Sequence, residues 1–203
     1  MQLVSYFDSQ LLFEFSMATL FYWFFLCRVQ SEGIGVVKGN PNFVDETPTG
    51  VNNAAWVAGR WAHFRLRKRK HRPRGSWLKQ CCSCNGDSTA SQWCLVCRLK
   101  PYLESKDELE PLWNFKAAFF LKEVRRALTS FGHPHASKAT LKMCRAGSAT
   151  HMALSGFAVA AKLAAGEWRS RAWLRYVDLN QVEQSVLLHK AFDEDAEEDD
   201  VMQ

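Results

Sequence analysis

The sequence predicts a mainly α-helical domain of the α+β class that carries a small antiparallel β-hairpin sheet. Apolar residues recur at helical spacing in residues 5–29, in 111–131 and again across 140–191. In residues 55–66, two apolar segments flank a turn at 58–60, and the second alternates Trp61, His63 and Arg65 with Ala62, Phe64 and Leu66, which is a hairpin signal. With 203 residues, 47% of them hydrophobic, the chain is long enough to bury one good core.

The first segment contains a strongly apolar and aromatic stretch, residues 11–27, with two interpretations. It is slightly short for a membrane span, contains Glu14, Ser16 and Thr19, and stops at Arg28. We therefore expect a buried core helix, and a single-pass membrane protein anchored by this stretch is the alternative. The Gly-, Asn- and Pro-rich run that follows predicts a loop with at most one short strand.

Charge is distributed unevenly along the chain. All 26 Lys and Arg residues precede residue 191, whereas residues 191–203 hold seven acids and no base. The first 190 residues therefore set 26 bases against 14 acids, a formal charge of +12. Such a body suits a polyanionic partner, and we expect the acidic tail to be solvated and disordered.

The chain has seven cysteines and no convincing cleavable signal peptide, so a reducing, intracellular compartment is expected. Five of them lie in a Cys-rich insert at residues 80–98. Two pairs within it have the spacings C-x-C and C-x-x-C, nine residues apart. Reduced structural thiols are the preferred interpretation, and a tetrahedral zinc site is the alternative. The four residues of that alternative are Cys82, Cys84, Cys94 and Cys97.

The last third of the chain predicts a succession of Ala-rich helices. Gly156 and Gly166 fall where helix C-terminal caps would lie. The helices are expected over Thr140–Leu154, Phe157–Ala165, Ser170–Val177 and Asn180–Ala191.

The most specific motif runs from Lys142 to Asp178 and resembles the C-terminal signature of the tyrosine recombinase (phage integrase) family. That signature opens with His-x-x-Arg on a helix, continues through an apolar helix and a Gly-x-Trp turn, and ends with a Tyr. Arg145 matches its Arg, and Lys142 stands where the family usually has His. Trp168 of the Gly-Glu-Trp turn follows 23 residues after Arg145, and Tyr176 follows eight residues after that.

Two further family positions can be sought upstream. The family's first catalytic Arg ends an apolar helix in a pattern like L-x-R-x-x-E. Arg28 resembles it, with one extra residue before Glu32. The family's catalytic Lys lies on a β-hairpin between the two Arg motifs, which makes Lys70 the candidate, ahead of Lys68.

The resemblance implies DNA breakage and rejoining through a 3′-phosphotyrosine intermediate. Tyr176 would be the nucleophile, and Arg28 and Arg145 would hold the phosphate oxygens with forked, permanently charged donors. Lys70 would protonate the leaving 5′ hydroxyl, and Trp168 would donate its indole N–H to the phosphate. Lys142 keeps a donor where the family has His but lacks a base near neutral pH, which predicts reduced activity. This chemistry needs no ATP, metal or other cofactor.

The resemblance also implies an organisation and a set of partners. We expect a catalytic domain over residues 1–190 without the family's N-terminal core-binding domain, as in a truncated or domesticated copy. Its partner would be double-stranded DNA rather than a small molecule, in a nuclear or nucleoid-associated location. The helix after Tyr176 resembles one that docks onto a neighbouring protomer, which implies a homo-multimer on DNA. A non-catalytic nucleic-acid-binding protein with a Cys-rich zinc element is the main alternative.

Overall fold

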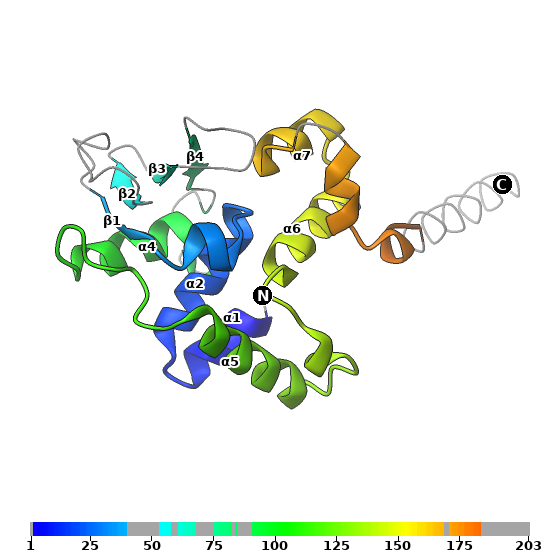
Figure 1. The fold of residues 1–203 in the computed structure, drawn as a ribbon, viewed down its shortest axis with the longest axis horizontal. Coiled ribbons are helices and arrows are strands. Elements are labelled where there is room, and N and C mark those ends of the chain that lie inside the picture. The colour runs from blue at the N-terminus through cyan, green and yellow to red at the C-terminus, as the bar shows by residue number, and fades with distance from the viewer. Residues whose placement is uncertain are drawn as a thin grey trace, which may run out of the picture. The chain divides into compact units, whose positions relative to one another are not determined.

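A computed structural model shows the chain as two compact units, Met1–Cys144 and Arg145–Gln203, which we describe separately (Figure 1). The structure describes residues 2–39, 53–57, 61–67, 75–82, 84, 91–168 and 171–183. Within them the fold is mainly helical with one small sheet, as the sequence predicted.

The apolar N-terminal segment forms two helices, α1 (Gln2–Ser9) and α2 (Phe13–Phe24), joined by a turn in which Leu11 has a φ of 57°. Eight consecutive residues of α2 are buried, so the helix is apolar on nearly every face because it lies at the centre of the core. No helix in the described part of the chain is both long enough and apolar enough to cross a membrane. Within the stretch 11–27, helix α2 is buried over Phe15–Tyr22, as predicted for a core helix, whereas Leu11 and Phe13 are exposed.

The sheet has four strands in the order β1-β2-β3-β4, with bounds Val37–Lys38, Asn53–Val57, Trp61–Leu66 and Ser76–Cys81. Strands β2 and β3 form the predicted hairpin, and β4 pairs with β3 in the antiparallel direction. Strand β1 pairs with β2 in the parallel direction. The sequence predicted a purely antiparallel sheet, which is wrong for this pair of strands.

Alternation on β3 connects the sheet to the helical core. Ala62, Phe64 and Leu66 are fully buried, whereas Trp61 is exposed, as the alternating pattern predicted. The ring of Phe64 contacts the ring of Phe21 of α2 edge to face, with centroids 4.8 Å apart. One face of the sheet is therefore part of the same core as α2.

Helices α4 (Leu95–Glu104) and α5 (Ala117–Ser130) complete the first unit, with a short 3₁₀ turn, η2 (Ala136–Lys138), after them. Helix α4 contacts α2 and strands β2, β3 and β4. Phe119, which lies in the predicted apolar segment 111–131, is 48% exposed. Phe120, Val124 and Ala127 are buried instead, at the spacing of one face of α5, which begins at residue 117.

The second unit consists of short helical segments. Its first helix is α6 (Met143–Leu154), whose first two residues still belong to the first unit. Helix α7 (Val159–Gly166) and a 3₁₀ segment, η3 (Arg171–Tyr176), follow. These three match the predicted helices to within a few residues, although the third is 3₁₀ rather than α. Residues 179–183 are helical, and the rest of the predicted last helix and the acidic tail lie outside the described residues.

A bidentate ion pair joins α1 to α4 in the first unit. Arg98 donates from Nη1 and Nη2 to the two carboxylate oxygens of Asp8, each at 2.8 Å, and Nη2 also lies 3.0 Å from Ser16 Oγ. Partial burial of Asp8 opposes its ionisation, but the hydrogen bonds from Arg98 and Ser16 and the charge of Arg98 outweigh it. The pKa of Asp8 is therefore lowered.

We expect Asp8→Asn to lower the free energy of unfolding by about 1–2 kcal/mol at pH 7, because it removes a charge-assisted pair. A lowered pKa in the folded state stabilises the fold above the unfolded-state pKa of about 3.9, and this stabilisation is lost as the pH falls through the folded-state value. The difference in free energy of unfolding between the wild-type protein and Asp8→Asn should thus be constant above about pH 5 and shrink below about pH 4. Urea unfolding at a series of pH values, with exposed Asp107→Asn as control, measures it. A difference that grows toward acid pH would contradict this assignment.

Candidate functional site

Three residues singled out by the sequence, Arg145, Trp168 and Tyr176, lie together in the second unit. Arg145 is in the first turns of α6, Trp168 follows α7, and Tyr176 ends η3. The guanidinium carbon of Arg145 lies 4.8 Å from the ring centroid of Trp168 and 5.1 Å from that of Tyr176. The two rings lie 5.6 Å apart at an angle of 36°. A cation and two aromatic rings thus share one small volume, although Tyr176 comes 31 positions after Arg145 in the chain.

The Gly-Glu-Trp turn places the indole. Helix α7 ends at Gly166, and Glu167 takes the left-handed conformation with a φ of 48°, which reverses the chain. A Cβ on Gly166 would overlap the six-membered ring of Trp168, so the indole packs directly on glycine backbone. Gly166 was predicted as the left-handed cap residue, but that conformation falls one residue later. The glycine is needed there for space.

Arg145 is fixed by both contacts and burial. Its side chain is buried, with the residue 3% exposed, and Nη2 donates to the carbonyl oxygen of Gly166 at 3.0 Å. The same carbonyl belongs to the residue under the indole, so one turn positions both side chains. A guanidinium is a permanently charged, forked donor of the kind that binds phosphate oxygens.

The indole N–H of Trp168 is a buried donor that has no hydrogen-bond partner within the part of the chain that the structure describes. A buried donor left without a partner costs about 1–3 kcal/mol, and a ligand oxygen or a water molecule at this point would remove that cost. An acceptor oxygen is the atom that would satisfy it.

The segment carrying Tyr176 is tied back to α6. The backbone N–H of Asp178 donates to Thr150 Oγ1 at 2.9 Å, and Thr150 is buried. Three residues before Tyr176 in the same segment is the buried Trp173, and Lys162 Nζ of α7 lies 5.1 Å from its ring centroid. Tyr176 itself is half-buried, and its ring lies against the Arg145 guanidinium.

Arg28 belongs to the first unit, where it pairs with Glu32. Arg28 Nη1 lies 3.0 Å from Glu32 Oε1, and Glu32 Oε2 accepts from the Arg28 backbone N–H at 2.8 Å. The extra residue between them is accommodated by a π-helical turn, η1 (Val29–Gly33), in which Gly33 N–H donates to Arg28 O. A π-turn holds one more residue than an α-turn, so the Glu still reaches back to the Arg. Such turns are frequent at functional sites.

Of the two candidate lysines, Lys142 lies within the described residues. Lys142 is exposed, and its backbone N–H lies 3.4 Å from Thr140 Oγ1. Lys70, like Lys68, lies outside the described residues, in the connection between β3 and β4. Of the six candidates, the structure thus brings together Arg145, Trp168 and Tyr176. It pairs Arg28 with Glu32, a residue that the sequence motif had already included.

Four cysteines form a second cluster, in the first unit. The Sγ atoms of Cys82, Cys84, Cys94 and Cys97 all lie within 4.8 Å of one another. Desolvation and the neighbouring thiols raise the pKa of Cys97 well above its ordinary value. The C-x-C and C-x-x-C spacings were the sequence signal for this cluster. Its four cysteines are residues that could hold a metal ion.

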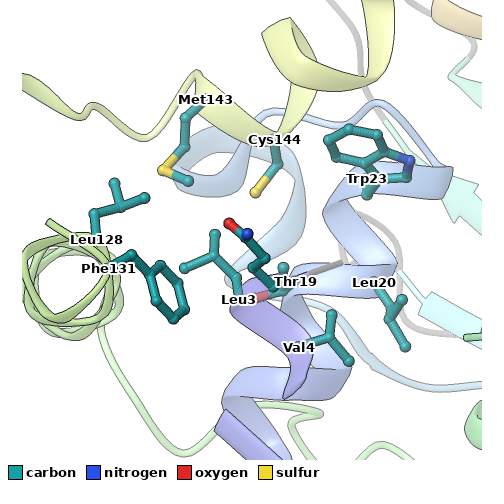
Figure 2. Close-up of a pocket in the computed structure, with 10 residues that line it drawn as sticks. Leu3, Val4, Thr19, Leu20, Trp23, Leu128, Phe131, Met143 and Cys144 are labelled. Atoms are coloured by element: carbon teal, nitrogen blue, oxygen red, sulfur yellow. The ribbon is translucent and has the colours of Figure 1, made fainter. Parts of the chain in front are cut away.

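A pocket of about 300 Å³ lies in the first unit between α1, α2, the end of α5 and the start of α6 (Figure 2). Its lining is mostly apolar, and the hydroxyl of Thr19 already donates to Phe15 O at 2.8 Å. Burial raises the pKa of the lining thiol of Cys144 to about 12, which keeps it protonated and unreactive at neutral pH. The pocket offers packing surface and no catalytic group among its lining residues. They are Gln2, Leu3, Val4, Thr19, Leu20, Trp23, Leu128, Phe131, Met143 and Cys144.

No protein family, curated protein or solved structure matches this chain.

Proposed function

We propose that this protein breaks and rejoins DNA strands by tyrosine-recombinase chemistry, serving recombination or integration. The observation that carries the proposal is the convergence of Arg145, Trp168 and Tyr176. A phenol, a guanidinium and an indole N–H are the groups that a covalent phosphotyrosine mechanism needs around one phosphate.

The proposed reaction is a reversible in-line displacement at phosphorus. The Tyr176 oxygen attacks a DNA phosphate, a bond forms between that oxygen and phosphorus, and the bond to the 5′ oxygen of the next nucleotide breaks. The phenol proton passes to water, and the leaving oxygen takes a proton from Lys70. Attack by a 5′ hydroxyl on the phosphotyrosine reverses these steps and rejoins the strand. The phosphate bond is conserved throughout, so the reaction requires no external energy source.

Charge stabilisation during this displacement would come from two arginines. Arg145 lies against the Tyr176 ring, and its guanidinium is a planar, forked donor group that suits phosphate oxygens. Its buried position raises the value of each contact with a phosphate oxygen, because the surroundings screen charge less than water does. Arg28, held by Glu32 within the first unit, is the second arginine that the family resemblance implies for phosphate binding.

The formal charge of +12 on the first 190 residues supports double-stranded DNA as the partner. Affinity should accordingly fall steeply with salt. Assembly of several copies on DNA through the helix after Tyr176, and a nuclear or nucleoid-associated location, follow from the same proposal.

A non-catalytic nucleic-acid-binding protein is the second candidate function, favoured by the four clustered thiols. Such a protein would bind DNA with the same salt dependence but would form no covalent intermediate. The two candidates therefore differ in one measurable event.

That event can be trapped with a labelled pool of nicked duplexes that lose a short 5′ fragment after cleavage, so that rejoining is prevented. We expect a denaturant-resistant protein–DNA adduct, and protease digestion followed by mass spectrometry should place the DNA on the peptide that contains Tyr176. The chain has four tyrosines, so the position is informative. Salt-sensitive binding without an adduct would favour the second candidate, and an adduct on Tyr6, Tyr22 or Tyr102 would overturn the assigned site.

A further inference from the structure

We propose that Cys82, Cys84, Cys94 and Cys97 bind one zinc ion that fastens the sheet to helix α4. The proposal does not depend on the DNA chemistry above, because it concerns residues and a readout of their own.

The distances between the four sulfur atoms are close to those of a metal site. Cys82 Sγ lies 3.2 Å from Cys84 Sγ, 3.4 Å from Cys97 Sγ and 3.8 Å from Cys94 Sγ. Cys84 Sγ lies 3.3 Å from Cys97 Sγ. In a tetrahedral site with Zn–S bonds of about 2.3 Å, the sulfur atoms are about 3.8 Å apart. A small outward movement of three thiols would therefore admit the ion.

The elements that present the thiols are well placed to bind a cation tightly. Cys82 directly follows β4, Cys94 is the N-cap residue of α4, and Cys97 lies in the first turn of that helix. Cys82, Cys84 and Cys94 are buried, and all seven cysteines are free thiols. The N-terminus of the ten-residue α4 stabilises the negative charge of the thiolates that binding creates.

The donor set selects the metal and its role. Four thiolates form a soft, closed tetrahedral set that suits zinc and leaves no position for a substrate or water. The ion would therefore be structural. It would connect the end of β4, which pairs with β3, to the start of α4, which contacts β2, β3 and β4. The ion would thus hold the sheet and α4 together.

The test uses the full chain, purified without chelator from a medium of defined metal content and analysed by elemental mass spectrometry. We expect one zinc per chain in the wild-type protein and in Cys81→Ser, and background zinc in Cys84→Ser and Cys97→Ser. Cys81 is the matched control because it is exposed and lies outside the cluster. Zinc-free wild-type protein, or zinc that survives both cluster substitutions, would overturn the proposal, as would stoichiometric iron in place of zinc.

A second measurement does not rely on variants that fold. Cobalt(II) exchanged into the wild-type protein should give the intense thiolate-to-cobalt charge-transfer and visible bands of a tetrahedral four-sulfur site, at one equivalent per chain. A spectrum without thiolate ligation would overturn the proposal. Loss of zinc with unchanged DNA trapping, or the reverse, separates this site from the one at Tyr176.

Discussion

Replacing Tyr176 with Phe is expected to abolish the covalent DNA adduct completely while leaving both the fold and DNA binding intact. The substitution removes only the hydroxyl, whereas the ring contacts with Arg145 and Trp168 remain. That hydroxyl makes no hydrogen bond within the described residues, so the free energy of unfolding should change by less than about 0.5 kcal/mol. The measurement is adduct yield on the trapping substrate, alongside thermal unfolding and the salt dependence of DNA binding.

Tyr6→Phe is the control for this prediction, because Tyr6 also packs by its ring, against Phe7 and Phe131, and lies in the other unit. It should retain the wild-type adduct yield. An adduct that persists at the same yield in Tyr176→Phe would show that Tyr176 is not the nucleophile, whatever the fate of Tyr6→Phe.

Arg145→Lys should lower the rate of adduct formation by about 100-fold or more, although it keeps the positive charge. Lysine lacks the planar fork that donates to a carbonyl and a phosphate at once, and it stacks less well on the two rings. The matched control is Arg125→Lys, since Arg125 also donates to a backbone carbonyl, that of Ala139, at 2.8 Å. That variant should be close to wild type.

A second substrate separates catalysis by Arg145 from a purely structural role. In a methylphosphonate linkage one non-bridging oxygen is replaced by an uncharged methyl group, so less charge must be stabilised in the displacement. If Arg145 contacts the phosphate, the deficit of Arg145→Lys should be clearly smaller on this linkage than on phosphodiester. Equal deficits on both substrates would mean that the residue acts only through packing.

Much of the fold follows from local pattern. The turn at 58–60 and the alternation around it predicted the β2–β3 hairpin, because strand periodicity and turn chemistry are both local. Strand β4 was not predicted, since it lies between a basic run and the cysteines and its alternation is weak. Its place depends on pairing with β3 and on Leu78 entering the core, which are tertiary effects. The parallel pairing of β1 likewise depends on contacts that no local pattern encodes.

The candidate site was predictable in part for the same reason. Arg145, Trp168 and Tyr176 were found because one segment resembles a family motif, and the structure brings them together. The convergence of the four cysteines was left open by the sequence, because spacing alone does not tell whether a loop of nine residues closes. The Arg28–Glu32 pair shows the opposite case, in which an irregular spacing is absorbed by a π-turn that no periodicity predicts.

The contact between Gly166 and the Trp168 ring has a practical consequence for recognising related chains. Any side chain at that position would displace the indole, so the glycine is as restrictive as the groups proposed to react. It lies 21 residues after Arg145, two before Trp168 and ten before Tyr176. A search pattern built on these four positions and their separations would select for the shape of the turn as well as for its chemistry. Chains that keep the Arg and the Tyr but carry a larger residue in place of the glycine must place the indole differently.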